Sequence, residues 1–243
     1  MNEVKNVQVL GVLGGMGPMA GATFASRMVA LTPAARDQDH IPLVLCNDPR
    51  VPDRSSARLG QGEDPLPAMV AGLRLLERAG ATLIAIPCNT AHLWYDQLAA
   101  ATSLPVLHIV ESVRDDLERL GVAGCRVGLM GTAATLQLDL YGEPLRRHGF
   151  PVLPTEPEEV RLCAEAIDAV KANDAERGFA PAAACIRRLV ARGARAVVLG
   201  CTELPLAVPH ASRGEFGAVL TDSIDALART AIRRCHTPME RQA

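Results

Sequence analysis

The feature that most constrains this chain is an internal repeat that places one cysteine in each copy. The repeated segments are LRLLERAGATLIAIPCNT, which contains Cys88, and IRRLVARGARAVVLGCTE, which contains Cys201. In each segment an apolar-periodic stretch ends at a glycine, Gly80 or Gly193, and a short apolar run leads to the thiol eight residues later. We therefore predict a duplicated unit. Two thiols at equivalent points of facing halves could address opposite faces of one substrate.

Five short apolar runs between longer helical patterns predict buried strands. They lie at 7–13, 41–46, 82–87, 126–130 and 196–200. Runs of this length without polar alternation are typical of parallel strands that are covered on both faces. The alternation of strands and helices predicts an α/β fold with right-handed crossovers, which binds ligands at the carboxyl ends of its strands. Both repeated cysteines fall at such ends.

The composition is that of a globular protein long enough for two domains. Of the 243 residues, 49% are hydrophobic and 21% are charged. Aromatic residues make up only 3% and the net charge is −2, so we expect no nucleic-acid or membrane partner. Residues 7–26 carry no charge, but their glycines and proline argue against a signal or membrane segment. The seven cysteines fit neither a disulfide framework nor a zinc site, which indicates a cytoplasmic protein.

Both repeated cysteines lie in settings that suit reactive thiols. Cys88 follows a predicted strand, and the pattern of Asn89 and Thr90 indicates the cap and first turn of a helix. Free N–H groups and the helix dipole favour thiolate at such a place. Cys201 has the same strand-to-loop setting. The alternative is a pair of inert buried cysteines, which is the commoner fate of a free thiol, but the matched contexts favour a catalytic pair.

A glycine-rich loop at 14–18 follows the first predicted strand. Its pattern from Gly15 to Ala20 matches G-x-G-x-x-A, so dinucleotide binding is an alternative. Pro18 inside the turn and the lack of a well-placed acidic residue after the second strand argue against that alternative. We expect instead a loop whose backbone amides hold a carboxylate.

Other polar side chains follow the remaining predicted strands. The loop NDPRVPDRSS carries Arg50 and Arg54, and either guanidinium could bind a substrate carboxylate through two hydrogen bonds. Thr132 and Thr135 offer hydroxyls after the fourth strand, and Lys171 lies late in a helical pattern. The alternatives are a solvated surface loop, a helix cap and an exposed lysine. The histidines show no metal-ligand spacing, so we expect no metal.

Together these motifs resemble those of the aspartate/glutamate racemase family, which inverts amino acids with two cysteines and no cofactor. The matching segments are GGMGP at 14–18, PDR at 52–54, PCNTAH at 87–92, GTAAT at 131–135, VK at 170–171 and GCTE at 200–203. They occur in the family's order and span nearly the whole chain. The chain is more similar to the aspartate racemase branch than to cell-wall glutamate racemases, which usually carry aspartate and serine where this chain has Gly15 and Met16.

The resemblance implies a role for each matching residue. Cys88 and Cys201 would transfer the Cα proton of an acidic amino acid, aspartate before glutamate, one as thiolate base and the other as thiol acid. The residues that would bind the substrate and shape the pocket are Met16, Asp53, Arg54, Asn89, Thr90, Thr132, Thr135, Lys171, Thr202 and Glu203. No cofactor would be needed.

The resemblance also implies the domain organisation. We expect two similar Rossmann-like α/β domains with parallel sheets related by pseudo-symmetry, an active site in the cleft between them, and a homodimer. The first domain would span 1–106 and be completed by the C-terminal helix 212–243, and the second would span 107–211.

Three other functions remain open from the sequence. Relatives on the same scaffold isomerise maleate, racemise hydantoins or decarboxylate malonate, and a maleate isomerase also uses a cysteine pair on a small dicarboxylate. A dinucleotide-dependent oxidoreductase would explain the glycine loop. A non-catalytic protein that binds small acids is the third, although intact thiols at both positions argue against it.

Overall fold

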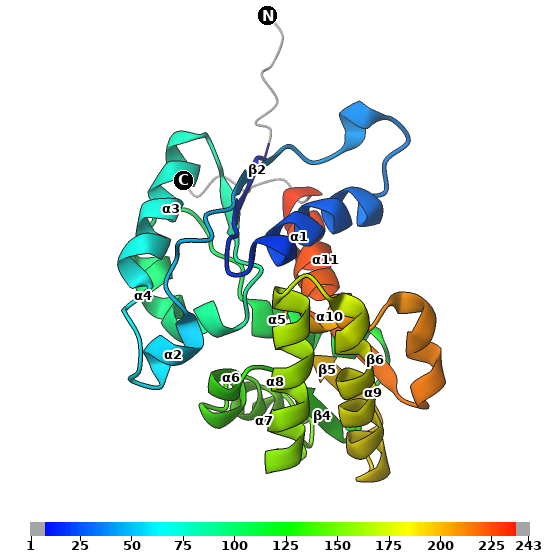
Figure 1. Ribbon diagram of the computed structural model, residues 1–243. Helices are drawn as coiled ribbons and strands as arrows, with labels where there is room; N and C mark the ends of the chain where they lie inside the picture. Colours follow the sequence, from blue (N-terminus) through cyan, green and yellow to red (C-terminus); the bar gives the residue numbers. More distant parts are fainter. Residues whose placement is uncertain (1–7, 237–243) are drawn as a thin grey trace, which may run out of the picture.

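The computed structural model describes residues 8–236 and has two halves, each built on a three-stranded parallel sheet (Figure 1). The first half is coloured blue to cyan and the second green to orange. The beginning of the first predicted strand, at residue 7, and the predicted frayed tail from residue 237 lie outside the described residues.

The strands confirm the predicted α/β class with parallel sheets. The first sheet has the order β2-β1-β3, with β1 (Leu10–Leu13), β2 (Leu43–Cys46) and β3 (Leu83–Ala85). The second has the order β4-β5-β6, with β4 (Val127–Met130), β5 (Ala196–Leu199) and β6 (Val219–Asp222). As predicted, β1, β3, β4 and β5 are buried along their whole length. The prediction for β2 was wrong: it is only partly buried, because it is an edge strand with one paired neighbour.

Two isolated parallel bridges extend the correspondence between the sheets. Ile84 of β3 bridges Val106, on the side that β6 occupies beside β5. Val127 of β4 bridges Val152, on the side that β2 occupies beside β1. Each sheet therefore has four equivalent strand positions. In each sheet one of the edge positions is occupied by a single bridge and not by a full strand. The strands before the repeated cysteines, β3 and β5, hold equivalent places, and so do β1 and β4.

The helices follow the same duplicated order. The first half contains α1 (Pro18–Leu31), η1 (Asp37–Asp39), α2 (Arg54–Arg58), α3 (Leu66–Arg78), η2 (Thr90–Trp94) and α4 (Tyr95–Ala100). The second half contains α5 (Ile109–Arg119), α6 (Ala133–Gln137), α7 (Gly142–Arg147), α8 (Pro157–Lys171), α9 (Ala175–Ala191), α10 (Leu204–Ala207) and η3 (His210–Phe216), and the last helix is α11 (Ser223–His236). As the repeat predicts, Gly80 after α3 and Gly193 after α9 both adopt left-handed backbone, with φ of 86° and 93°. Glycine takes this conformation without the steric cost of a side chain.

Apolar side chains from both halves share a central core. It combines Phe24 of α1, Val113 of α5 and Leu227 of α11. The outer face of each sheet has a core of its own, and these two contain Cys88 and Cys201 respectively. The two thiols therefore belong to equivalent layers of the two halves.

The C-terminal range 212–243, predicted as a helix that completes the first domain, is divided between the halves. β6 pairs with β5 in the second sheet, whereas α11 packs against α1 and α5 (Figure 1). The apolar runs did not predict β6, because its short sequence, Val219–Asp222, is only half-buried at its first two residues and ends in polar ones.

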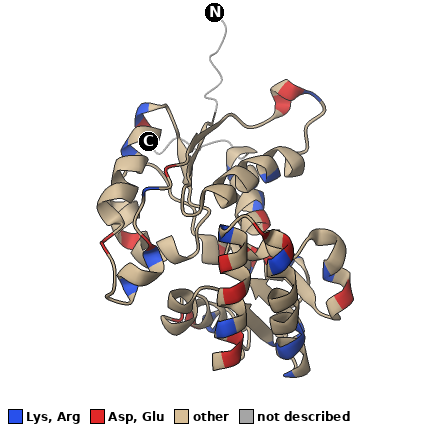
Figure 2. Cartoon of the chain, in the orientation of Figure 1, with Lys and Arg blue, Asp and Glu red and all other residues tan. Residues whose placement is uncertain are grey.

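The surface carries charges of both signs. On α8, Arg161 forms ion pairs with Glu158 and Glu165, and such mixed positions recur over the helices in Figure 2. All seven cysteines are free thiols. Within residues 8–236, no helix combines the length and apolar character that crossing a bilayer requires.

Candidate active site

One cavity between the halves collects most of the residues singled out by the sequence. Its lining consists of Met16, Asp53, Arg54, Ser55, Cys88, Asn89, Thr90, Thr132, Lys171, Cys201, Thr202 and Glu203. Of the predicted site residues, Thr135 alone is missing from this lining. The cavity measures about 20 Å³, enough for about one water molecule, so its lining side chains leave little free space between them.

Parallel strands explain why residues so distant in sequence meet here. Met16 follows β1, Cys88 follows β3, Thr132 follows β4 and Cys201 follows β5. The carboxyl ends of parallel strands lie at one edge of a sheet, and the two sheets present these edges to the same cavity. The duplication thus places both thiols at a single site.

The surroundings of Cys88 act in opposite directions on its thiol. The side chain is 5% exposed, and this burial raises the pKa of Cys88 above its usual value. The positive charge of Arg54 and hydrogen bonds from the Ala91 N–H and the Arg54 side chain lower that pKa, whereas the charge of Glu203 raises it. As expected, an N–H group of the following turn, that of Ala91, lowers the pKa of Cys88, but the turn is a short 3₁₀ segment and desolvation outweighs this contribution.

The surroundings of Cys201 raise the pKa of its thiol, although a hydrogen bond from the Glu203 N–H acts in the opposite direction. Its Sγ donates a hydrogen bond to Oε2 of Glu203 at 2.9 Å, and both side chains are buried. Burial raises the pKa of Cys201 well above its usual value, and the charge and the hydrogen bond of Glu203 raise it further. Thr202 also donates to Glu203 Oε2, at 3.3 Å. Cys201 is therefore held as a protonated thiol.

Three threonine hydroxyls join the two halves across the cavity. Thr90 Oγ1 lies 3.0 Å from Thr132 Oγ1 and 3.3 Å from Thr135 Oγ1. Thr132 caps α6 by accepting from the Thr135 N–H at 3.2 Å. Thr135 therefore lies behind the cavity lining and contacts the hydroxyls that face it. Thr132 therefore has both of the roles considered from the sequence, because it caps α6 and also lines the cavity.

The structure distinguishes between the two arginines of the 47–56 loop. Arg54 lines the cavity, and its Nη1 donates to the carbonyls of Val51 and Pro52 at 3.1 and 2.9 Å. Its buried Nε has no hydrogen-bond partner among the described residues. Arg50 is 87% exposed and pairs with Asp48, so it belongs to the solvated surface.

Asp53 and Lys171 complete the charged part of the lining. Asp53 caps α2 by accepting from the Ser56 N–H at 2.7 Å. Partial burial raises the pKa of Asp53, but its hydrogen bonds from Ser56 and the positive charges of Lys171 and Arg54 outweigh burial and hold the pKa below the usual value. Lys171 is an exposed residue at the end of α8, and the same position brings it to the cavity from the second half.

The glycine-rich loop at 14–18 packs closely against the loop that follows β2. A Cβ on Gly15 would lie 2.1 Å from the carbonyl oxygen of Asp48, and one on Gly14 would lie 2.7 Å from Oδ1 of Asn47. These glycines therefore allow the loop after β2 to approach closely. Pro18 is the first residue of α1, with Gly17 as the N-cap, so it lies just after the turn and not inside it as predicted.

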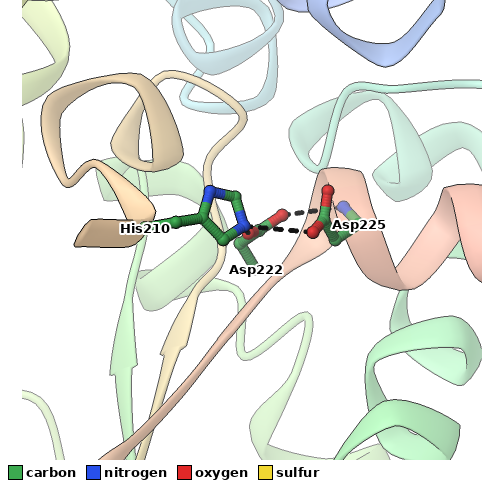
Figure 3. Close-up of side chains that lie close together, drawn as sticks. All are labelled: His210, Asp222 and Asp225. Atoms are coloured by element: carbon green, nitrogen blue, oxygen red, sulfur yellow. Dashed lines mark hydrogen bonds and ion pairs between the residues drawn. The ribbon is translucent and has the colours of Figure 1, made fainter. Parts of the chain in front are cut away.

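One group of side chains among residues 8–236 has the composition of a cation site, and it consists of His210, Asp222 and Asp225 (Figure 3). Each of the two carboxylates already accepts hydrogen bonding from an arginine side chain. Arg27 donates two hydrogen bonds to Asp225 at 2.6 and 2.7 Å, and Arg213 donates to Asp222 at 2.6 Å. The acidic charges are compensated, so this cluster connects η3, β6 and α11 to α1 as a structural network.

Sequence reasoning missed two residues that contact the site. Asn89, which lines the cavity, is hydrogen-bonded to Tyr141 before α7 and to Ser223 at the start of α11. Ser223 follows the unpredicted strand β6, and no motif in the sequence distinguishes it. Nothing in the local sequence distinguishes Tyr141.

Known proteins resemble this chain along most of its length. Residues 13–231 match the Asp/Glu/Hydantoin racemase family. A broad-specificity amino-acid racemase from Bacillus subtilis (strain 168) is 30% identical over 151 residues, which cover 60% of this chain and 63% of that protein. The match thus spans slightly less than two thirds of that relative's length.

Solved structures resemble the whole fold. An aspartate racemase from Picrophilus torridus has a TM-score of 0.84 and 28% identity, covering 96% of each chain. A glutamate racemase from Campylobacter jejuni subsp. jejuni has a TM-score of 0.66 at 18% identity, covering 96% of this chain and 88% of that one. The second likeness concerns the fold alone.

Proposed function

Because this chain belongs to the Asp/Glu/hydantoin racemase family, we propose that it interconverts the L and D forms of an acidic amino acid, aspartate before glutamate, without a cofactor. The single observation that supports this proposal most is the pair of buried thiols on one cavity. Cys88 and Cys201 reach it from equivalent strand ends of the two halves. A racemase that uses two bases requires an acid and a base on opposite sides of Cα, and equivalent positions in facing halves suit that need.

The unequal surroundings assign starting roles to the thiols. Cys201, bonded to Glu203, is the proton donor, and Cys88, beside Arg54, is the base that removes the Cα proton. After one turnover the protonation states are reversed, and the enzyme is then ready for the other enantiomer. Positioned acids and bases typically accelerate such a proton transfer by about 10²- to 10⁴-fold.

In this proposal, uncharged hydrogen-bonding groups bind one end of the substrate, and the cations Arg54 and Lys171 bind the other. The hydroxyls of Thr90 and Thr132 and the Asn89 carboxamide bind the α-carboxylate and amino group, close to the developing carbanion. Arg54, with its unpartnered Nε, and Lys171 bind the acidic side chain. A second small dicarboxylate, maleate, suits the same charges, so it belongs in the test.

The small cavity requires a movement before the substrate enters. The cavity of about 20 Å³ is much smaller than any amino acid, and the Thr90–Thr132 hydrogen bond spans the two halves. The cleft opens to admit the substrate and closes again to exclude water during the reaction, which strengthens the electrostatic interactions inside.

Exchange of the Cα hydrogen for deuterium tests the proposal. The purified, reduced protein is incubated in D₂O with L-aspartate and L-glutamate, with no cofactor added, and the products are analysed by mass spectrometry and chiral chromatography. We expect deuterium at Cα together with the D enantiomer. Neutral amino acids belong in the panel, because the Bacillus subtilis relative has broad specificity by name. If folded protein exchanges no amino acid and converts maleate to fumarate, an isomerase replaces the racemase. The homodimer that the resemblance implies is tested on the same protein by light scattering.

A further inference from the structure

Asn89 is held at both ends of its carboxamide by residues outside the cavity lining. Its Nδ2 donates to Ser223 Oγ at 2.8 Å, and its Oδ1 accepts a hydrogen bond from the Tyr141 hydroxyl. Asn89 itself is 2% exposed and lines the cavity next to Cys88. The two partners come from separate elements, so three distant segments of the chain meet at this side chain.

The hydrogen-bond directions determine which way the carboxamide faces. The pKa of Tyr141 is raised well above its usual value by burial and by the nearby acidic groups of Cys201 and Asp222, so the phenol keeps its proton and acts as a donor. Ser223 donates its own proton to the Leu199 carbonyl at 3.3 Å, and its oxygen is then free to accept from Asn89. A flipped carboxamide would place its NH₂ against the Tyr141 hydroxyl and its oxygen against Ser223 Oγ.

The packing around Tyr141 keeps it in this place. Its side chain is 1% exposed, and Gly200 leaves room for the ring, since a Cβ there would lie 3.1 Å from Tyr141 Cε2. Gly200 directly precedes Cys201. The same aromatic ring therefore contacts the strand end that carries one thiol, while its hydroxyl contacts the residue that follows the other.

The structural network at the start of α11 keeps Ser223 in place. Asp222 accepts from the Asp225 N–H at 2.7 Å and from Arg213, and Asp225 accepts from Arg27 of α1 (Figure 3). Ser223 lies between these two aspartates and is fully buried. The compensated charges thus fix the first turn of α11 relative to the first half.

We infer that Tyr141 and Ser223 are positioning residues, which orient the Asn89 carboxamide toward the substrate so that one N–H of Nδ2 and one lone pair of Oδ1 remain available to it. The inference rests on the proposed function and extends it to two residues that do not line the cavity. A free carboxamide would present the wrong group for part of the time, and a displacement of about 1 Å can cost about 100-fold in rate.

A double-mutant cycle tests whether the two residues act through Asn89. We expect Tyr141→Phe and Ser223→Ala each to lower kcat/KM by about tenfold or more, and Tyr141→Phe to have almost no further effect in an Asn89→Ala background. If the effects of Tyr141→Phe and Asn89→Ala multiply, Tyr141 acts independently of Asn89 and the inference is wrong. Tyr95→Phe and Ser112→Ala are matched controls, because their hydroxyls bond to the backbone carbonyls of Val106 and His108.

A second measurement is independent of catalysis. The side-chain NH₂ signal of Asn89, assigned by its loss in Asn89→Ala, is followed by NMR hydrogen exchange. We expect slow exchange in the wild type and at least tenfold faster exchange in Tyr141→Phe and Ser223→Ala, but no change in the two controls. Unchanged protection in both site variants would overturn the inference even in an active racemase. An inactive wild type with this protection pattern would instead refute the proposed function and leave the positioning intact.

Discussion

Cys88 and Cys201 hold equivalent places in the two halves, but opposite charges lie beside them. Arg54 is the charged side chain that favours thiolate at Cys88, whereas Glu203 accepts a hydrogen bond from Cys201 at 2.9 Å and keeps it protonated. Duplication determines where the thiols lie, because strand ends are copied with the fold. The loops differ between the copies, and their charges shift the pKa values of the two thiols unequally, in addition to the burial that raises both.

This difference is useful for a reaction that needs one acid and one base. Two thiols with identical surroundings would have no preferred site for the first ionisation, because either could lose its proton equally well. Unequal neighbours make Cys88 the easier thiol to deprotonate, although burial raises the pKa of both. The comparison therefore predicts that exchanging the local charges would affect the thiols in opposite directions.

The largest expected effect is loss of racemisation when either thiol is removed. Cys88→Ser and Cys201→Ser should each lower the rate of racemisation by about 10²- to 10⁴-fold, because a serine hydroxyl is far less acidic than a thiol. Chiral chromatography of the products measures this. Cys125→Ser is the control, since that cysteine is only partly buried and lies outside the cavity. Wild-type turnover in either site variant would show that two bases are not used.

The next effect concerns the protonated half of the pair. Glu203→Gln removes the negative charge that raises the pKa of Cys201, so the thiolate should form at lower pH. We expect Cys201 to react with iodoacetamide about tenfold faster at neutral pH, as measured by peptide mass spectrometry. Glu165→Gln, an exposed change on α8, should leave the rate unchanged. A slower reaction at Cys201 would contradict the assigned role of Glu203.

The reverse effect is expected in the other half. Arg54→Gln removes the positive charge that lowers the pKa of Cys88, so the thiolate should need a higher pH and Cys88 should react severalfold more slowly. The same loop supplies the control: Arg50→Gln, exposed and paired with Asp48, should change nothing. If both cysteines respond to Arg54→Gln in the same direction and by the same factor, the change acts on access to the cleft and the comparison of charges fails.

The smallest expected effect is on the free energy of unfolding, and it concerns a histidine that the second half lacks at the equivalent position. His92 Nδ1 lies 2.8 Å from the Cys88 carbonyl oxygen, while Pro205 holds the equivalent position after Cys201. Burial, together with the nearby His108 charge, lowers the pKa of His92 from 6.5 to about 3. Between these two pH values His92 is protonated in the unfolded state but neutral in the folded state. The free energy of unfolding therefore decreases as the pH falls from about 6.5 toward 3, by at most about 1.4 kcal/mol per pH unit.

Urea unfolding at several pH values measures this effect. The free energy of unfolding of His92→Gln should depend less steeply on pH than that of the wild type over this range. His148→Gln is the control, because His148 is exposed at the end of α7. An identical pH dependence in wild type and His92→Gln would show that other groups dominate acid sensitivity.

The sequence was a good guide to features that depend on neighbouring residues. Buried runs of β-branched and other apolar residues predicted five of the six strands, and Gly80 and Gly193 marked the ends of equivalent helices. Strand ends then located both cysteines, because parallel strands in a sheet end at a common edge. Where the apolar run was short and ended in polar residues, as at β6, it carried too little signal to predict a strand.

Only the tertiary structure decided the contacts between distant segments. Charge and position after a strand do not separate Arg54 from Arg50, yet the fold brings one to the cavity and leaves the other in solvent. The bonds of Asn89 to Tyr141 and Ser223 span 52 and 134 residues. The sequence by itself determined that two equivalent thiols follow two buried strands, since hydrophobic periodicity is local. Their protonation and the orientation of the side chains around them depend on burial and on contacts between segments of the chain, which exist only once the chain has folded.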